Sequence, residues 1–400
     1  MNTNYLVIGA GIFGISAAIE LRKRGCSVSV INPDKIPHPL AASTDISKIV
    51  RMEYGSDEEY MDMAIESMAM WREWNDLLGE KIYHEIGFAI LSSQSIENEK
   101  QAFERNSYHH LIKKGFQPER LNDGKIAAYF PAFNADKYVD GIYHQIAGFA
   151  ESGRAVELLA KYAVKMGVQI FENQTAEKII ITNNQAEGVK TTEGQIFNAD
   201  QIIVCAGNFT PYLIPELKPY FKITGHPVFH LKPENPALFT SPNFPVFSAD
   251  ISNTGWYGFP LHPKEQVVKV ALHSEGLELH PANDERMVYD SDIEKLRKFL
   301  RESIPDLAEA PIVFTRRCCY TDTLDGHFWI DNHPEIENLI IGSGGSGHGF
   351  KMGPSVGKMI SDVATGNSHR LSDRYRWREL DACTVQREEA RFLEAMRNVE

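Results

Sequence analysis

The stretch Tyr5-Leu6-Val7-Ile8-Gly9-Ala10-Gly11-Ile12-Phe13-Gly14 joins a short apolar run to a GxGxxG turn. The apolar run predicts a strand buried on both faces of a parallel sheet. A helical pattern follows, ends at Gly25, and leads to a second apolar run over residues 28–31. In this order the glycines predict a dinucleotide site, because they allow a tight turn, close approach of a pyrophosphate and close helix–strand packing. The phosphates would lie at the positive end of the helix.

One position departs from the dinucleotide-binding pattern. The residue directly after the second run is Asn32, where such chains usually carry an acidic residue that accepts hydrogen bonds from the ribose hydroxyls. Asn still offers one acceptor oxygen and adds two donors. We therefore expect Asn32 to face the cofactor, with Asp34 as a possible substitute acceptor. The alternative to a dinucleotide site is a glycine-rich turn in an ordinary α/β protein.

Composition limits the classes of function. The chain has 400 residues, 43% hydrophobic and 24% charged, which is typical of a globular protein with two or three domains. A net charge of −13 without a basic block argues against nucleic acid as a partner. No run of eighteen apolar residues exists, and the N-terminus is already the first predicted strand, so we expect neither a membrane span nor a signal peptide. Five scattered cysteines form no disulfide framework or zinc motif, so we expect a reducing cytoplasm and no metal site.

Apolar strands and turn residues divide the chain into two interleaved parts. We predict an α/β protein with a discontinuous Rossmann-type domain over residues 1–85, 149–212 and 324–375. Short alternating runs with prolines predict an inserted α+β domain, mainly antiparallel, over residues 86–148 and 213–323. One helix in this domain is expected from Asp290 to Ser303, and another begins near Ser56-Asp57 in the first part. The last residues, 376–400, are predicted to form a charged amphipathic helix.

Four blocks of sequence resemble the FAD-dependent amine oxidases of the D-amino-acid oxidase superfamily, in the group of monomeric sarcosine, N-methyltryptophan and fructosyl-amino-acid oxidases (amadoriases). These are the glycine turn, Ser43–Tyr54, Ile202–Gly207 and Arg317–Lys351. The resemblance covers nearly the whole chain. It implies FAD held by Gly9, Ala10, Gly11, Ile12, Phe13, Gly14, Asn32, Ser43, Thr44, Lys48, Ala176, Ala206, Gly207, Cys318, Gly345, Gly347, His348, Gly349, Phe350 and Lys351.

The resemblance also implies a covalent thioether from cysteine to flavin, which falls on Cys318 in the run Cys318-Cys319-Tyr320-Thr321. Arg316 and Arg317 would favour a thiolate there. The alternatives are Cys319 as the linked residue, or a buried structural thiol. The two adjacent cysteines cannot readily bond to each other.

Two cations match the substrate-carboxylate site of the family, Arg51 and Lys351. A guanidinium presents a planar fork of donors to two carboxylate oxygens. The alternative for Arg51 is a surface ion pair with Glu53 or Asp57, which would contribute only about 0–1 kcal/mol.

Lys269 lies in an apolar run, Val267-Val268-Lys269-Val270-Ala271, where a buried lysine is costly without a purpose. The resemblance implies a catalytic cation that assists the reduction of oxygen, with Lys48 as its partner. The alternative is an edge strand from which Lys269 reaches solvent. His273 is expected on the same side of the strand and matches an active-site histidine; Tyr320 is expected to contact substrate. Lys48 favours the amadoriases, whereas His273 favours the sarcosine oxidases.

The resemblance therefore implies an FAD-dependent oxidase of a secondary amine bearing a carboxylate, with an imine that hydrolyses and hydrogen peroxide as products. Alternatives within the enzymes are a fructosyl-amino-acid oxidase and an amine dehydrogenase with another electron acceptor. A nicotinamide dehydrogenase is disfavoured by the later cofactor blocks, and a non-catalytic flavoprotein by the retention of Arg51, Lys269, Cys318 and Lys351 together. The expected partners are a small amine and O2, and a monomer is compatible with this function.

Overall fold

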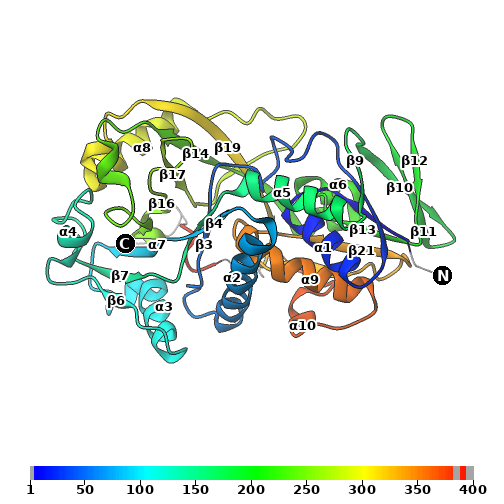
Figure 1. Ribbon diagram of the computed structural model, residues 1–400, viewed down its shortest axis with the longest axis horizontal. Helices are drawn as coiled ribbons and strands as arrows, with labels where there is room; N and C mark the ends of the chain where they lie inside the picture. The colour runs from blue at the N-terminus through cyan, green and yellow to red at the C-terminus, as the bar shows by residue number, and fades with distance from the viewer. Residues whose placement is uncertain (1–3, 382–387, 393–400) are drawn as a thin grey trace.

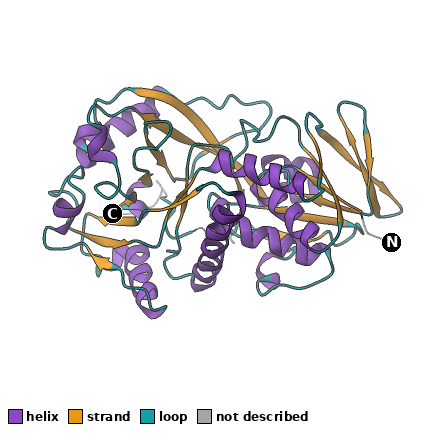
Figure 2. Cartoon of the chain, viewed as in Figure 1, coloured by secondary structure: helices purple, strands orange, loops and turns teal. Residues whose placement is uncertain are grey.

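Two large sheets organise the chain, which is described by a computed structural model over residues 4–381 and 388–392 (Figures 1 and 2). The first sheet has six strands, in the order β20 (Trp329–Asn332), β21 (Leu339–Ser343), β13 (Gln201–Val204), β1 (Asn4–Ile8), β2 (Ser27–Ile31) and β9 (Gln169–Phe171). Its strand pairs are parallel except β20 with β21 at one edge. The first sheet is thus the predicted Rossmann-type sheet.

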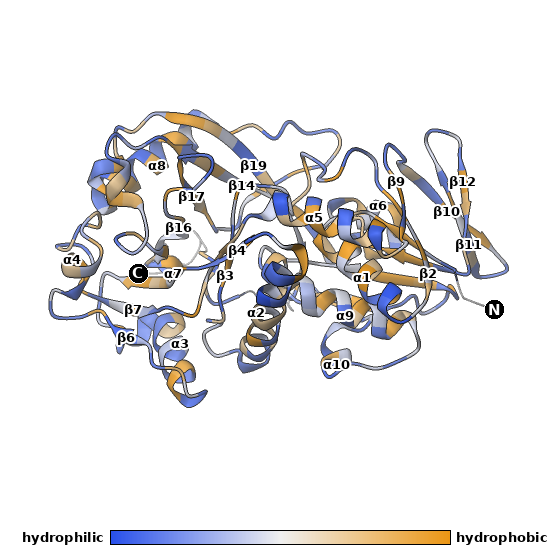
Figure 3. Ribbon diagram, viewed as in Figure 1, coloured by the Kyte–Doolittle hydropathy of each residue, from blue (hydrophilic) through white to orange (hydrophobic). Residues whose placement is uncertain are grey.

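Both faces of this sheet are covered. Val7 and Ile203 pack with the helices α1 (Ile12–Lys23), α2 (Glu58–Leu78), α5 (Ser152–Lys165) and α9 (Gly353–Ala364). Leu6 and Ile8 point the other way, toward a small sheet of β10 (Ala176–Thr182), β11 (Gln185–Thr191) and β12 (Ile196–Asn198). Burial on both faces explains why the central strands are continuously apolar (Figure 3).

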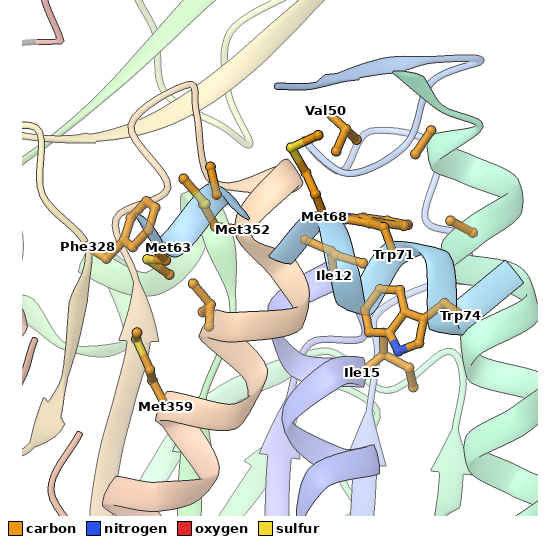
Figure 4. Close-up of a cluster of buried hydrophobic side chains, with 14 of the residues drawn as sticks. Ile12, Ile15, Val50, Met63, Met68, Trp71, Trp74, Phe328, Met352 and Met359 are labelled. Atoms are coloured by element: carbon orange, nitrogen blue, oxygen red, sulfur yellow. The ribbon is translucent and has the colours of Figure 1, made fainter. Parts of the chain in front are cut away.

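The helical layer contains the largest apolar cluster. Figure 4 shows Ile12 and Ile15 of α1 beside Trp71 and Trp74 of α2. The start of α2 is fixed by Asp57, whose side chain accepts a hydrogen bond of 3.0 Å from the amide of Tyr60. This end agrees with the predicted helix start, and the buried apolar residues of α2 pack in the core.

The second large sheet is mainly antiparallel. Its order is β18 (Leu277–Glu278), β14 (Phe221–Leu231), β17 (Val268–Leu272), β16 (Trp256–Gly258), β15 (Val246–Ala249), β5 (Phe88–Ser92), β7 (Asp140–His144) and β6 (Glu119–Arg120), and β19 (Ile312–Thr323) also pairs with β14. Only β15 and β5 run parallel among these pairs of described strands. Helix α8 (Asp290–Ser303) packs on one face of the sheet. The predicted fold class is confirmed.

The opposite face of this second sheet carries the candidate site. Strand alternation sends Val268 and Val270 toward α8, so Lys269 and Ala271 point the other way. The remaining described strands and α-helices are β3 (Lys48–Val50), β4 (Tyr83–Glu85), β8 (Gly148–Ala150), α3 (Ala102–Lys113), α4 (Lys125–Tyr129), α6 (Thr210–Leu213), α7 (Ile251–Thr254) and α10 (Ser372–Tyr375). Strand β3 pairs with β8 and leads directly into Arg51.

The predicted C-terminal helix is wrong where the structure describes it. Residues 376–381 and 388–392 are not helical, and the rest of that range lies outside the described residues. Tertiary contacts take the place of helical backbone hydrogen bonds here. The amide of Trp377 donates to the side chain of Asp331 at 2.7 Å, and Arg378 pairs with Asp325 at 2.6 Å. Among the described residues, no helix has the length and apolar character needed to span a membrane.

Candidate active site

A cavity of about 540 Å³ runs along the glycine turn between β1 and α1. Its wall contains many of the residues predicted to hold the cofactor: Gly9, Ala10, Gly11, Ile12, Phe13, Asn32, Ser43, Thr44, Lys48, Ala176, Ala206, Gly207, Gly345, Gly347, Gly349 and Phe350. Tyr320 also lines it. Other predicted residues lie outside this wall, namely Gly14, Arg51, Lys269, His273, Cys318, His348 and Lys351.

The glycines have the local geometry that a dinucleotide requires. Gly9 has a φ of +99°, and a Cβ there would lie 2.5 Å from the carbonyl oxygen of Cys205. Gly14 packs helix against strand, since a Cβ would lie 2.0 Å from the carbonyl oxygen of Gly9. A second glycine turn covers residues 342–349, and there a Cβ on Gly349 would lie 2.8 Å from the ring of Phe13. Glycine at these positions therefore permits the tight turn and the close packing of a dinucleotide site, and the residues along the turn fit FAD.

Asn32 stabilises the glycine turn itself. Its Oδ1 accepts a hydrogen bond of 3.1 Å from the amide of Ala10, and its Nδ2 donates to the carbonyl oxygen of Asp34 at 2.7 Å. The acceptor that we expected to face the ribose thus already has a donor within the protein. The side chain of Ser43 accepts from the amide of Ile12 at 3.0 Å, at the start of α1. Asp34 is not part of the cavity wall.

Strand β19 separates the two adjacent cysteines onto opposite faces. Cys318 packs with Val228, Ala271 and Tyr320, and its Sγ lies 4.0 Å from Nζ of Lys48. Cys319 packs with Ile223 and Leu279 on the other face, where burial raises the pKa of its thiol. The same alternation corrects the expected role of Arg317.

Arg317 shares the face of Cys319 and pairs with Asp292, so it does not serve Cys318. Arg316 donates to the carbonyl oxygens of Ala41 and Thr44 in the loop beside the cavity. Lys48 is the described cation whose Nζ lies 4.0 Å from the Cys318 sulfur.

Lys269 is buried in the middle of the second sheet. Strand β17 lies between β14 and β16, so the edge-strand alternative is wrong. Its Nζ lies 2.7 Å from Oδ2 of Asp45 and donates to the carbonyl oxygen of Ser47. Burial lowers the pKa of Lys269 to about 8, against the opposing attraction of Asp45. Asp45 also lies 3.4 Å from Nε2 of His230. The charge of Lys269 holds the pKa of Asp45 well below its usual range despite burial.

Arg51 and Lys351 both lie close to the Tyr54 ring. The Arg51 Cζ and the Lys351 Nζ are 5.3 Å and 4.7 Å from the ring centroid. Both side chains are buried, so the surface-pair alternative for Arg51 is wrong. Glu53 instead pairs with His144, and Asp57 with Arg374. Burial, with repulsion from Arg51, lowers the pKa of Lys351 to about 7.

His273 and Tyr320 meet at the second glycine turn. Their ring centroids are 5.9 Å apart, and a Cβ on Gly347 would lie 2.5 Å from the Tyr320 ring and 3.2 Å from Cε1 of His273. Burial lowers the pKa of His273, which favours the neutral imidazole, and raises the pKa of Tyr320 well above its usual value. The pair therefore lies against a glycine that lines the cofactor cavity.

Glu388 links two of the predicted site residues, and the sequence analysis does not predict it. Its Oε1 lies 2.7 Å from Nη2 of Arg51, and its Oε2 lies 3.5 Å from Nε2 of His273. No local pattern distinguishes this glutamate from the other charged residues near the C-terminus. Asp45 was also missed, although a buried Lys269 required an anion, and the matched block around Ser43 contains one.

A family model for FAD dependent oxidoreductases (DAO) matches residues 4–363. The chain belongs to this family. Among its relatives, L-saccharopine oxidase of Schizosaccharomyces pombe is 28% identical, with 95% of this chain and 94% of the relative covered. Monomeric sarcosine oxidase of Bacillus sp. is 27% identical, with 93% and 95% covered. The predicted family is confirmed, and the relatives are amine and amino-acid oxidases.

The fold of this FAD-dependent oxidoreductase matches solved structures. Fructosamine oxidase (amadoriase II) of Aspergillus fumigatus superposes with a TM-score of 0.83 at 23% identity, covering 98% of this chain and 94% of that one. At this identity the likeness establishes the fold alone. FAD is therefore the cofactor of the family, and the cavity described above fits it.

Proposed function

We propose that the protein oxidises the C–N bond of a secondary amine that carries a carboxylate, such as sarcosine or another N-substituted amino acid. The amine loses two electrons and two protons to give an imine, and water then hydrolyses the imine to a carbonyl compound and a primary amine. Oxygen takes up the two electrons and two protons as hydrogen peroxide. FAD, when bound, supplies the hydride acceptor for this chemistry.

The carboxylate site carries the proposal. Arg51 and Lys351 are two buried cations around Tyr54, and Nη2 of Arg51 holds a carboxylate oxygen of Glu388 at 2.7 Å. This geometry is that of a charge-assisted hydrogen bond to a carboxylate. Binding the substrate carboxylate here would hold the amine near His273 and Tyr320, beside the cofactor cavity. Such positioning converts the reaction into an intramolecular one.

We assign the remaining predicted residues to two tasks. His273 and Tyr320 shape the pocket and contact the amine, and the neutral imidazole leaves the amine free of charge repulsion. Lys269, with Lys48 nearby, supplies positive charge where oxygen is reduced. The ion pair of Lys269 with Asp45 keeps most of that charge at neutral pH, since attraction to Asp45 raises the lysine pKa against burial.

Cys318 is the proposed site of covalent flavin attachment. Its sulfur faces Lys48 at 4.0 Å, whereas Cys319 faces an apolar cluster and has a raised pKa. Lys48 thus places positive charge beside the Cys318 sulfur, which is the kind of surrounding that reactive cysteines have. A C–S bond would replace one S–H bond and one C–H bond of the cofactor. The two electrons and two protons released would pass to oxygen as hydrogen peroxide.

A fructosyl-amino-acid oxidase is the second candidate. Lys48 favours it, because the amadoriases tend to carry lysine where sarcosine oxidases carry arginine. A substrate panel separates the candidates: N-methyl, N-carboxyalkyl and fructosyl amino acids, with peroxide as the readout. Primary amino acids and an N-methyl amino-acid methyl ester serve as controls. Oxidation of primary amino acids alone, or equal rates with the ester, would contradict the proposal.

A further inference from the structure

The segment Glu388–Phe392 lies in the site that we assign to the substrate carboxylate. Glu388 is the residue that enters it: its side chain is only 8% exposed and contacts Arg51 at 2.7 Å and His273 at 3.5 Å. Arg51 and Lys351 attract this carboxylate, and they hold its pKa well below the usual range in spite of burial. Glu388 is therefore an anion held among basic side chains in this pocket.

Contacts made by the residues that follow Glu388 dock the segment. Arg391 donates to both carboxylate oxygens of Asp322, at 2.9 Å and 2.7 Å, and to the carbonyl oxygen of Ser274 at 2.8 Å. The amide of Phe392 donates to the carbonyl oxygen of His273 at 3.2 Å. Glu389 accepts from the side chain and the amide of Ser56. These contacts fix the backbone that follows Glu388 and thereby hold its side chain on Arg51.

Glu388 contacts only one of the two terminal nitrogens of the Arg51 guanidinium. Nη2 holds one oxygen of Glu388, while Nη1 is buried and has no hydrogen-bond partner among the described residues. A buried guanidinium donor without a partner is unfavourable. A free carboxylate in a planar, two-point arrangement would satisfy both nitrogens. The pocket therefore holds Glu388 in a way that a small external carboxylate can improve on.

We propose that Glu388 is an internal ligand of the substrate-carboxylate site, and that substrate binds only after the segment Glu388–Phe392 moves off Arg51. This inference rests on the proposed function, which places the substrate carboxylate on Arg51. The segment is tethered, so it competes at an effective concentration in roughly the millimolar range or above. If it occupies the site about nine-tenths of the time, the apparent affinity for an external carboxylate falls about tenfold.

Calorimetric titration of the full-length, FAD-loaded protein with acetate tests this inference. Glu388→Gln keeps the shape of the side chain and removes its charge, so we expect acetate to bind about tenfold tighter or more. Glu379→Gln is the matched control, because Glu379 is exposed and precedes the docked segment; its acetate affinity should equal that of the wild type. Unchanged or weaker acetate binding in Glu388→Gln would overturn the proposal.

A second variant loosens the segment and keeps the Glu388 carboxylate. Arg391→Gln removes the ion pair with Asp322, and we expect a smaller gain in acetate affinity in the same direction. If acetate affinity rises in neither variant, the internal-ligand proposal is refuted. Thermal melting identifies a variant that folds poorly, and the other variant then decides the test.

Arg51→Gln in the Glu388→Gln background separates this inference from the proposed function. Acetate binding that does not depend on Arg51 would refute the proposed carboxylate site itself. Acetate binding that depends on Arg51 but is insensitive to Glu388 would refute the internal ligand alone.

Discussion

Substitution of Arg51 by Gln should selectively impair the oxidation of amines that carry a carboxylate. The guanidinium is buried and already holds a carboxylate oxygen at 2.7 Å, so the contact has the geometry of a charged hydrogen bond. Loss of such a bond costs about 1.5–3 kcal/mol. This range corresponds to roughly 10- to 150-fold in kcat/KM. Because the wild-type substrate must first displace Glu388, we expect the lower half of that range.

The assay compares an N-methyl amino acid with its methyl ester, using peroxide release to measure kcat/KM. Arg51→Gln should impair oxidation of the acid and leave that of the ester within a fewfold. Arg51→Lys keeps the charge without the planar fork, so its loss for the acid should be intermediate. Equal losses for acid and ester would refute the reasoning, because they would indicate general damage to the site. An unimpaired Arg51→Gln enzyme would refute it as well.

Three further results are expected. Lys269→Met should slow the reaction of the reduced enzyme with oxygen at least tenfold in stopped-flow measurements and leave anaerobic reduction by the amine unchanged. In the wild type, the oxygen reaction should slow as the pH rises through about 8, because the pKa of Lys269 is lowered to about 8 and the lysine loses its charge above that pH. A flat pH profile would contradict this role. Cys318→Ala should release the yellow colour from acid-precipitated protein, whereas Cys319→Ala should retain it; the reverse result would move the link to Cys319. Gly14→Ala should lower the free energy of unfolding by roughly 1–3 kcal/mol in denaturant titrations, because the new Cβ would lie 2.0 Å from the Gly9 carbonyl oxygen; an unchanged value would show that helix and strand can separate without cost.

Local pattern was sufficient for much of the fold. The glycine turn, the apolar run over residues 5–8 and the helix from Asp290 to Ser303 depend on neighbours in sequence, and the structure has them where the pattern predicts. The placement of Lys269 could also be anticipated, because a lysine within an apolar run must be paired when buried. Its actual partner, Asp45, lies on a distant loop.

Contacts between distant segments could not be read from the pattern. Glu388 reaches Arg51 across more than three hundred residues of sequence, and the charged segment around it reads equally well as a helix. Asn32 likewise matched the ribose position of the motif, but its acceptor is used by the amide of Ala10. Arg317 is a near neighbour of Cys318 in sequence, but alternation along β19 places its side chain on the face of Cys319, where it pairs with Asp292.

Anaerobic addition of secondary amino acids to the purified, FAD-loaded protein tests the central claim most directly. We predict that at least one N-methyl, N-carboxyalkyl or fructosyl amino acid bleaches the flavin colour. Admission of oxygen should restore the colour and release hydrogen peroxide in proportion to the amine consumed. Retention of the colour with every secondary amino acid, or bleaching by primary amino acids alone, would contradict the account.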